Sequence, residues 1–169
     1  MTLILRNVQK AVHLDLQVFK NEINTLRELF QVHQYEMSVI CVEKEYIQSL
    51  NRKYRGLDEP TDVLAFPFHE CDVPGKLPGL EDINTELNQL GDIVLCLPYI
   101  ADQCKQNNEK LNTGNILPVM VTHGICHLIG YDHETQKQWR EMYNTELNIL
   151  TTFNHLTGKN CKPLLGVGH

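Results

Sequence analysis

The chain has 169 residues, of which 42% are hydrophobic, and this proportion excludes an intrinsically disordered protein and fits one globular domain. Its 15 Lys plus Arg against 21 Asp plus Glu give a net charge of −6, which excludes a protein that coats nucleic acid through bulk charge. A nuclease with a local basic cleft is not excluded, because the local field steers a substrate and the total charge does not.

The first part of the chain is predicted to alternate strands and helices. Residues 2–7 form a β-rich run that predicts a strand, and residues 16–30 carry apolar side chains at helical spacing behind an aspartate N-cap. Residues 35–42 predict a second strand. A short helix is expected at 47–55, where a following glycine stops it.

The middle of the chain contains two further strands and a long polar stretch. A third strand is predicted at 63–66, where a proline limits it. Residues 69–90 are rich in Pro and Gly, and a loop of this length is typical of a functional flap or a variable insertion. A fourth strand is expected at 91–97, and a helix with proline in its first turn at 98–108.

The last part of the chain is predicted to be helical. After a loop at 112–115, residues 116–129 form a helix that is almost wholly apolar apart from its histidines, and we expect it to be central. An amphipathic helix follows at 135–150. We expect a single catalytic domain over residues 1–156 and a loose tail at 157–169.

These elements mix strands and helices without a strict βαβ repeat. They predict an α+β fold, in which a small mixed sheet of about four strands packs with helices around the histidine-bearing helix. No apolar run approaches the length of a bilayer-spanning helix, so no membrane partner is expected. No secretory signal is visible, so we expect an intracellular protein that is not secreted.

Three histidines fall close together around Gly130. His123 and His127 are four residues apart, so on a helix they lie one turn apart on the same face. Gly130 follows where a helix ends in a left-handed residue, and the chain can then bring His133 back toward the first two. The spacing H-x3-H-x2-G-x2-H is that of the metzincin metalloproteases, and it predicts a three-histidine zinc site with a fourth position for water.

One residue departs from the protease pattern. Metzincins carry glutamate as general base directly after the first histidine, and this chain has Gly124 there. We therefore expect a metal site without the peptidase base. Zinc is the expected ion, because imidazole ligands suit it, and its charge can neutralise negative charge on a phosphoryl oxygen.

Two neighbours of the histidines have alternative interpretations. Asp132 precedes His133 and is either a partner that orients or assists the metal site or the cap of the last helix. Cys126 lies between the first two histidines in sequence, and a packed core thiol is favoured over a metal ligand.

A small basic cluster, Arg52, Lys53 and Arg55, stands out in an acidic chain. The default interpretation of such a cluster is a solvated helix face. The functional alternative is a substrate-binding phosphate clamp, because the planar guanidinium fork matches phosphate oxygens.

Three motifs resemble those of the YbeY family of metal-dependent endoribonucleases. H-G-I-C-H-L-I-G-Y-D-H at 123–133 is similar to the family's H-G-x-x-H-L-x-G-Y-D-H, including glycine in place of the protease glutamate. The second is N-x-x-Y-R-G at 51–56 followed by P-T-D-V-L-A-F-P at 60–67, and the third is L-G-D-I at 90–93. Together they extend in order over about half of the chain.

The resemblance implies a single-strand-specific endoribonuclease of ribosomal RNA maturation and ribosome quality control, with an α+β fold. It implies zinc bound by His123, His127 and His133, and it identifies Arg55 as the arginine of the RNA cleft. It also implies contact with small-subunit assembly, including a small-subunit ribosomal protein and an Era-type GTPase.

The hypothesis is a zinc hydrolase that cuts single-stranded RNA near the ends of small-subunit ribosomal RNA. His123 and Arg55 are its candidate catalytic residues, with Arg55 holding a phosphate oxygen and stabilising developing charge. With Gly124 in place of the protease base, either the reaction needs no separate base or a group such as Asp92 assists. The rival functions are a metzincin-like peptidase, against which Gly124 speaks, and a non-catalytic assembly factor with structural zinc, which normally has four protein ligands.

Two departures from compact bacterial members of the family stand out. The family usually has serine where this chain has Ala65, so the role of that hydroxyl is lost or passes to a neighbour such as Thr61. The stretch 69–90 is longer, and the chain contains six cysteines, which together favour a eukaryotic, organellar version. We therefore expect a mitochondrial location, with the cytoplasm as the alternative.

Overall fold

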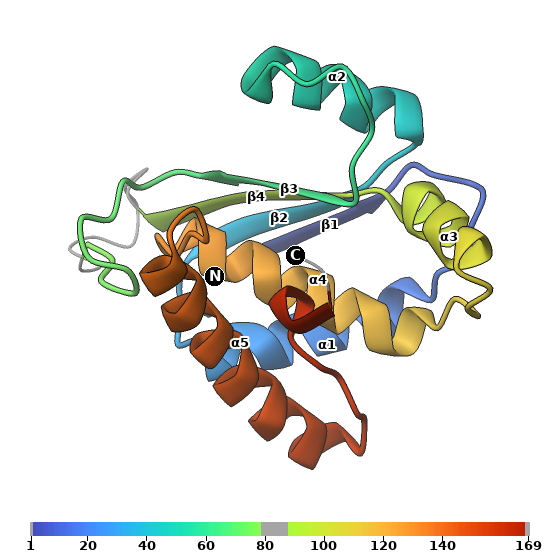
Figure 1. Ribbon diagram of the computed structural model, residues 1–169. Helices are drawn as coiled ribbons and strands as arrows, with labels where there is room; N and C mark the ends of the chain where they lie inside the picture. Colours follow the sequence, from blue (N-terminus) through green and yellow to red (C-terminus); the bar gives the residue numbers. More distant parts are fainter. Residues whose placement is uncertain (1, 79–87, 168–169) are drawn as a thin grey trace.

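A four-stranded mixed sheet forms the middle layer of the protein in the computed structural model, which describes residues 2–78 and 88–167 (Figure 1). The strands are β1 (Leu3–Asn7), β2 (Glu36–Cys41), β3 (Val63–Pro67) and β4 (Gln89–Leu95). Their order is β1-β2-β4-β3, with β1, β2 and β4 parallel and β3 antiparallel to β4 at one edge. The predicted α+β fold with a small mixed sheet is confirmed.

Helices cover both faces of this sheet (Figure 1). They are α1 (Leu16–Leu29), α2 (Lys44–Arg55), α3 (Leu97–Gln106), α4 (Thr113–Leu128), α5 (Gln136–Thr157) and the short 3-10 helix η2 (Leu164–Val167). Helices α1, α4 and α5 lie on one face, and α2 lies on the other. Across the two described ranges, no helix combines the length and apolar character needed to cross a membrane.

Helix α4 is the central helix, as its sequence predicts. It contacts β3, β4, α1 and α5, and Val121, Ile125 and Leu128 on it are fully buried. Because its apolar residues lie on all sides, the helix buries surface against the sheet and against helices at once. Its histidines are therefore carried on one of the most enclosed elements of the fold.

Several predicted boundaries differ from the structure. Residues 112–115 are not a loop, because Asn112 is the N-cap and α4 begins at Thr113 with a polar first turn that lacks the apolar signal. Helix α2 begins at Lys44, before its first buried residue, Ile47. Strand β4 ends at Leu95, and the proline-containing turn that follows already belongs to α3.

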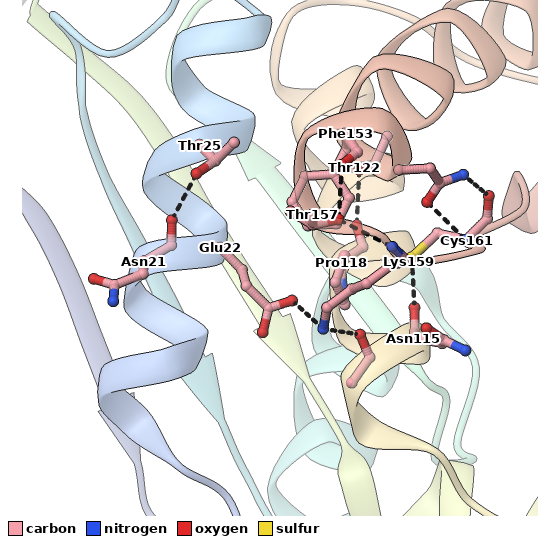
Figure 2. Close-up of polar contacts among 12 residues, drawn as sticks. Asn21, Glu22, Thr25, Asn115, Pro118, Thr122, Phe153, Thr157, Lys159 and Cys161 are labelled. Carbon is pink, nitrogen blue, oxygen red and sulfur yellow. Dashed lines mark hydrogen bonds and ion pairs between the residues drawn. The ribbon is translucent and has the colours of Figure 1, made fainter.

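The tail that follows α5 is packed in place, so the expectation of a loose tail is wrong for its described residues (Figure 2). Lys159 Nζ lies 2.9 Å from Glu22 Oε2 on α1 and donates to Gly114 O on α4 at 2.5 Å. Asn154 and Cys161 exchange two hydrogen bonds of 2.9 and 2.8 Å. The two leucines that open η2 are buried, so the tail closes one end of the core.

Candidate metal centre

Three imidazoles converge where α4 ends. His123 and His127 come from α4, and His133 comes from the turn before α5. One ring nitrogen from each histidine lies within 4.8 Å of the other two, and Nε2 of His123 is 3.2 Å from Nε2 of His127. The ring centroid of His133 lies 5.5 Å from that of His123 and 5.2 Å from that of His127. The structure therefore brings the three predicted ligands together.

Gly130 makes this turn possible. Its φ is +101°, a conformation that side chains disfavour, and a Cβ at this position would lie 2.7 Å from Cβ of Cys71. The turn is closed by backbone bonds from Gly130 N to His127 O and from Tyr131 N to Cys126 O. Glycine is thus needed here both for backbone conformation and for space.

Two of the histidines are oriented through their second ring nitrogen. His123 Nδ1 is 2.8 Å from Oε1 of Glu146, and His127 Nδ1 is 3.0 Å from the backbone oxygen of Tyr131. Because both acceptors require a proton on Nδ1, the lone pairs on the two Nε2 atoms are left free to face a common point. Partners of this kind fix the tautomer and direction of metal-binding histidines.

Glu146 is the site residue that the sequence analysis missed. It lies on α5 and is fully buried, and within the described chain its Oε2 has no hydrogen-bond partner. The available signal was its spacing, because Glu146 falls four residues from both Met142 and Leu150 on the buried stripe of α5. An acid in the middle of an apolar stripe is costly to bury unless it is paired.

The donor set fits a divalent cation. Burial, together with the neighbouring His123 and His133, lowers the pKa of His127 to about 4, so His127 is neutral at pH 7. Neutral imidazole is the form that binds metal. The buried carboxyl group of Glu146 lies 2.8 Å from His123 Nδ1, and a cation held by the histidines would offset the cost of burying its charge.

The histidines open onto a cleft of about 630 Å³. Strand β3 forms one wall of the cleft, and His69, Glu70 and Cys71, at the start of the expected loop 69–90, contribute to another. Residues 79–87 of that loop lie outside the described residues. Arg55, at the last turn of α2, also lines the cleft, so an arginine and three histidines from distant parts of the chain share one cavity.

The other members of the basic cluster lie away from the cleft lining. Arg52 is 3.7 Å from the carboxylate of Asp58, in an exposed pair. Lys53 Nζ lies over the ring of Tyr54, 5.1 Å from its centroid. The structure therefore separates Arg55 from Arg52 and Lys53.

The two candidate acids have different positions. Asp132 lines the cleft, and its carboxylate accepts a hydrogen bond from His133 N at 2.8 Å. It does not cap α5, because the N-cap is Thr135, which forms a capping box with Gln138. Asp92 does not reach the cleft: its carboxylate accepts from the Ser38 hydroxyl on the opposite face of the sheet.

Gly124, which replaces the protease base, lies where α4 meets the sheet. A Cβ at this position would lie 2.8 Å from Cδ1 and 3.0 Å from Cγ1 and Cγ2 of Ile93 on β4. Helix and sheet therefore approach so closely that any Cβ would force a shift of the Ile93 side chain or of α4. The position is occupied by a packing contact, which disfavours a glutamate there.

A family model described as "Endoribonuclease YbeY" matches residues 5–154, which is most of the chain and includes all of the site. The chain belongs to the YbeY endoribonuclease family. A Homo sapiens relative named "Endoribonuclease YbeY" is 37% identical over 164 residues, covering 97% of this chain and 95% of the relative. A relative of the same name from Thermoanaerobacter sp. (strain X514) is 33% identical over 146 residues, covering 85% of this chain and 90% of the relative.

A solution structure from Thermotoga maritima has the same overall fold as this YbeY-family chain. It aligns with a TM-score of 0.54 and 24% identity, covering 96% of this chain and 99% of the other. At that identity, the likeness concerns the fold alone. It agrees with the mixed sheet and central helix described above.

The YbeY motifs outside the histidine segment hold the walls of the cleft. Asn51 is buried and donates to Glu59 O at 2.9 Å, which fastens the loop between α2 and β3. Gly91 has a φ of +136°, and a Cβ there would lie 2.3 Å from Phe66 O, so glycine lets β3 lie close to β4. Ala65 and Thr61 both line the cleft, so Thr61 shares the cavity with the position at which the family usually has serine.

Proposed function

We propose that this protein is a zinc-dependent endoribonuclease that cuts single-stranded RNA during maturation of small-subunit ribosomal RNA. The observation that carries the proposal is the shared cleft, in which Arg55 and the three histidines face one cavity. Membership of the YbeY family supplies the reaction class, which is hydrolysis of RNA.

His123, His127 and His133 would hold the ion. When bound, zinc supplies Lewis-acid charge that stabilises negative charge developing on a phosphoryl oxygen. Arg55 would donate to a phosphate oxygen and position the scissile bond, for which its guanidinium is well shaped. Glu146 keeps the His123 ring in its binding orientation.

Asp132 is the assisting acid that the geometry supports. It lines the cleft beside His133, whereas Asp92 faces the other side of the sheet. In this position the Asp132 carboxylate can hold a proton-bearing group of the substrate or an attacking water in line with the phosphate.

Specificity for single strands is supported by the size of the cleft. A cavity of about 630 Å³ is suited to a ligand of a few ring systems, which corresponds to one or two nucleotides and not to a duplex. Unpaired RNA can spread its bases and phosphates into such a cavity, while the bases of an A-form duplex remain stacked.

The wider role follows from the family and remains part of the proposal. We include ribosome quality control, contact with a small-subunit ribosomal protein and contact with an Era-type GTPase. We also propose a mitochondrial location, which is supported by the long 69–90 stretch and the six cysteines.

Two rival functions are less well supported. A metzincin-like peptidase needs a base after the first histidine, but this chain has Gly124 there, and the close contact with Ile93 disfavours any side chain at that position. A purely structural zinc site normally has four protein ligands, whereas the cluster found among the described residues has three.

The test is cleavage of a labelled single-stranded RNA by zinc-loaded protein. We expect His123→Ala and Arg55→Ala each to reduce kcat/KM by about 100-fold or more, because one removes a ligand and the other a charge at the phosphate. Arg52→Ala is the matched control, since Arg52 is exposed on the same helix and does not line the cleft. If the His123 and Arg55 variants cut as fast as the parent, the proposal is wrong.

A further inference from the structure

Strand β3 has two different sides along the edge of the sheet. Ala65, Pro67 and His69 line the cleft with the histidines. Successive side chains of a strand alternate between its faces, so Phe66 points to the opposite side. Phe68 follows the end of the strand, and its ring meets that of His69, a cleft residue, edge to face at a centroid distance of 5.1 Å.

An aromatic ledge, formed by Tyr54 and Phe66, lies on that opposite side. Tyr54 comes from the last turn of α2, and its ring meets Phe66 edge to face at a centroid distance of 5.1 Å. Tyr54 is 58% exposed and Phe66 is partly exposed, so both offer ring surface to solvent. Large aromatic rings exposed side by side are unusual for a surface without a ligand.

Positive charge accompanies the ledge. Lys53 Nζ lies over the Tyr54 ring at 5.1 Å, and Arg55 is the next residue along the chain. Among the residues that the structure describes, no acidic side chain forms a salt bridge with Lys53 or Arg55. The nearby acid Asp92 lies opposite Phe66 on β4, and its carboxylate accepts a hydrogen bond from Ser38. The positions of these charges favour a polyanion along β3 and α2 and disfavour one over β4.

The ledge is also continuous with the candidate active site. Arg55 lines the cleft, and Tyr54 beside it lies on the ledge, so the end of α2 joins the two surfaces around the free edge of β3. Exposed aromatic rings interleaved with cations are the means by which proteins bind unpaired nucleic acid, because every base can stack on a ring.

We propose that the aromatic ledge is a base-stacking subsite, on which unpaired bases flanking the scissile phosphate rest while the phosphate lies in the cleft. This inference rests on the proposed function, since it assumes a single-stranded RNA substrate. It assigns Tyr54 and Phe66 to stacking and Lys53 to the phosphate between the stacked bases. The subsite distinguishes unpaired from paired RNA, because paired bases cannot spread onto the ledge.

The test measures cleavage of an oligouridylate by zinc-loaded protein, with a fully abasic deoxyribose-phosphate oligomer of the same length as competitive inhibitor. Tyr54→Ala is expected to raise KM for the oligouridylate about 5- to 100-fold, the effect of losing one stacked base. This variant should not change the Ki of the abasic oligomer, which has phosphates but no bases. Lys53→Gln should raise both constants, because it removes charge.

Two controls separate stacking from folding. Tyr54→Phe keeps the aromatic ring, so its KM for the oligouridylate is expected to equal that of the parent. Tyr46→Ala removes a tyrosine that is 53% exposed at the other end of α2, and it should match the parent. A parental KM for Tyr54→Ala, in a protein that cuts oligouridylate, overturns the base-stacking role of the ledge and leaves the proposed function standing. A parent protein that cuts no oligouridylate overturns both.

Discussion

Glu146 couples the metal site to the core of the molecule. Its carboxylate reaches Nδ1 of His123 from a different helix, and it is fully buried. A bound cation, a histidine and a carboxylate in a row share charge, so each makes burial of the others less costly. The orientation of His123 therefore depends on how α5 packs against α4.

We predict that Glu146→Gln weakens zinc binding by about 10- to 100-fold, because the amide keeps the size of the side chain but loses its charge. The measurement is zinc affinity by competition with a chromophoric chelator. Glu141→Gln, a change on the exposed side of the same helix, is the control and should leave the affinity unaltered. Equal affinities for the two variants would show that Glu146 does not support the metal.

The site was predictable from sequence where its signals are local. His123, His127 and Gly130 have fixed spacing along one helix and its end, so their convergence with His133 follows from helix geometry. Glu146 was missed and Asp92 was misplaced because their positions depend on which elements pack together. No spacing along the chain specifies that contact.

Among the elements, the contact between α4 and β4 controls where the histidines stand. Gly124 lies so close to Ile93 that any Cβ would force a shift of the Ile93 side chain or of α4. Close helix-to-sheet packing of this kind lets α4 carry the ligands right beneath the edge of the sheet. The same contact explains why the chain departs from the protease pattern.

We predict that Gly124→Ala lowers the free energy of unfolding by about 1 kcal/mol. Overpacking against Ile93 costs about 1–3 kcal/mol, and the gain of about 1 kcal/mol in helix propensity offsets part of this cost. Urea denaturation measures the change. In the double variant Gly124→Ala/Ile93→Val, removal of Cδ1 should recover part of the loss. A more stable Gly124→Ala protein would contradict the steric account.

Helices and strands were predicted well where capping and periodicity coincide. Asp15 caps α1 by accepting from the N–H groups of Gln17 and Val18, as its position before the apolar run predicts. Gly56 ends α2 with a φ of +72°. The polar first turn of α4 and the strand order carry no periodic signal, and they were therefore not predicted.

At the scale of the whole molecule, the tail links parts of the core that are distant in sequence. Lys159 joins α1 through Glu22 and α4 through Gly114 (Figure 2). A run of Gly and Lys after the last helix is typical of a loose end, and only these long-range partners order it. Because α4 carries two of the histidines, the tail supports the helix that positions them.

We predict that Lys159→Met destabilises the protein by about 1–3 kcal/mol, because it leaves the largely buried Glu22 carboxylate unpaired. Thermal unfolding of the zinc-loaded protein is the measurement. Lys162→Met, at an exposed position of the same tail, is the control and should change stability little. If both variants unfold at the parental temperature, the tail does not stabilise the core.

Zinc K-edge X-ray absorption of the protein loaded with one equivalent of zinc tests the metal centre most directly. We predict three imidazole nitrogens and one further oxygen, all about 2.0–2.2 Å from the ion. A sulfur shell at about 2.3 Å, or a fourth ligand from the protein, would show a closed structural site and contradict the account.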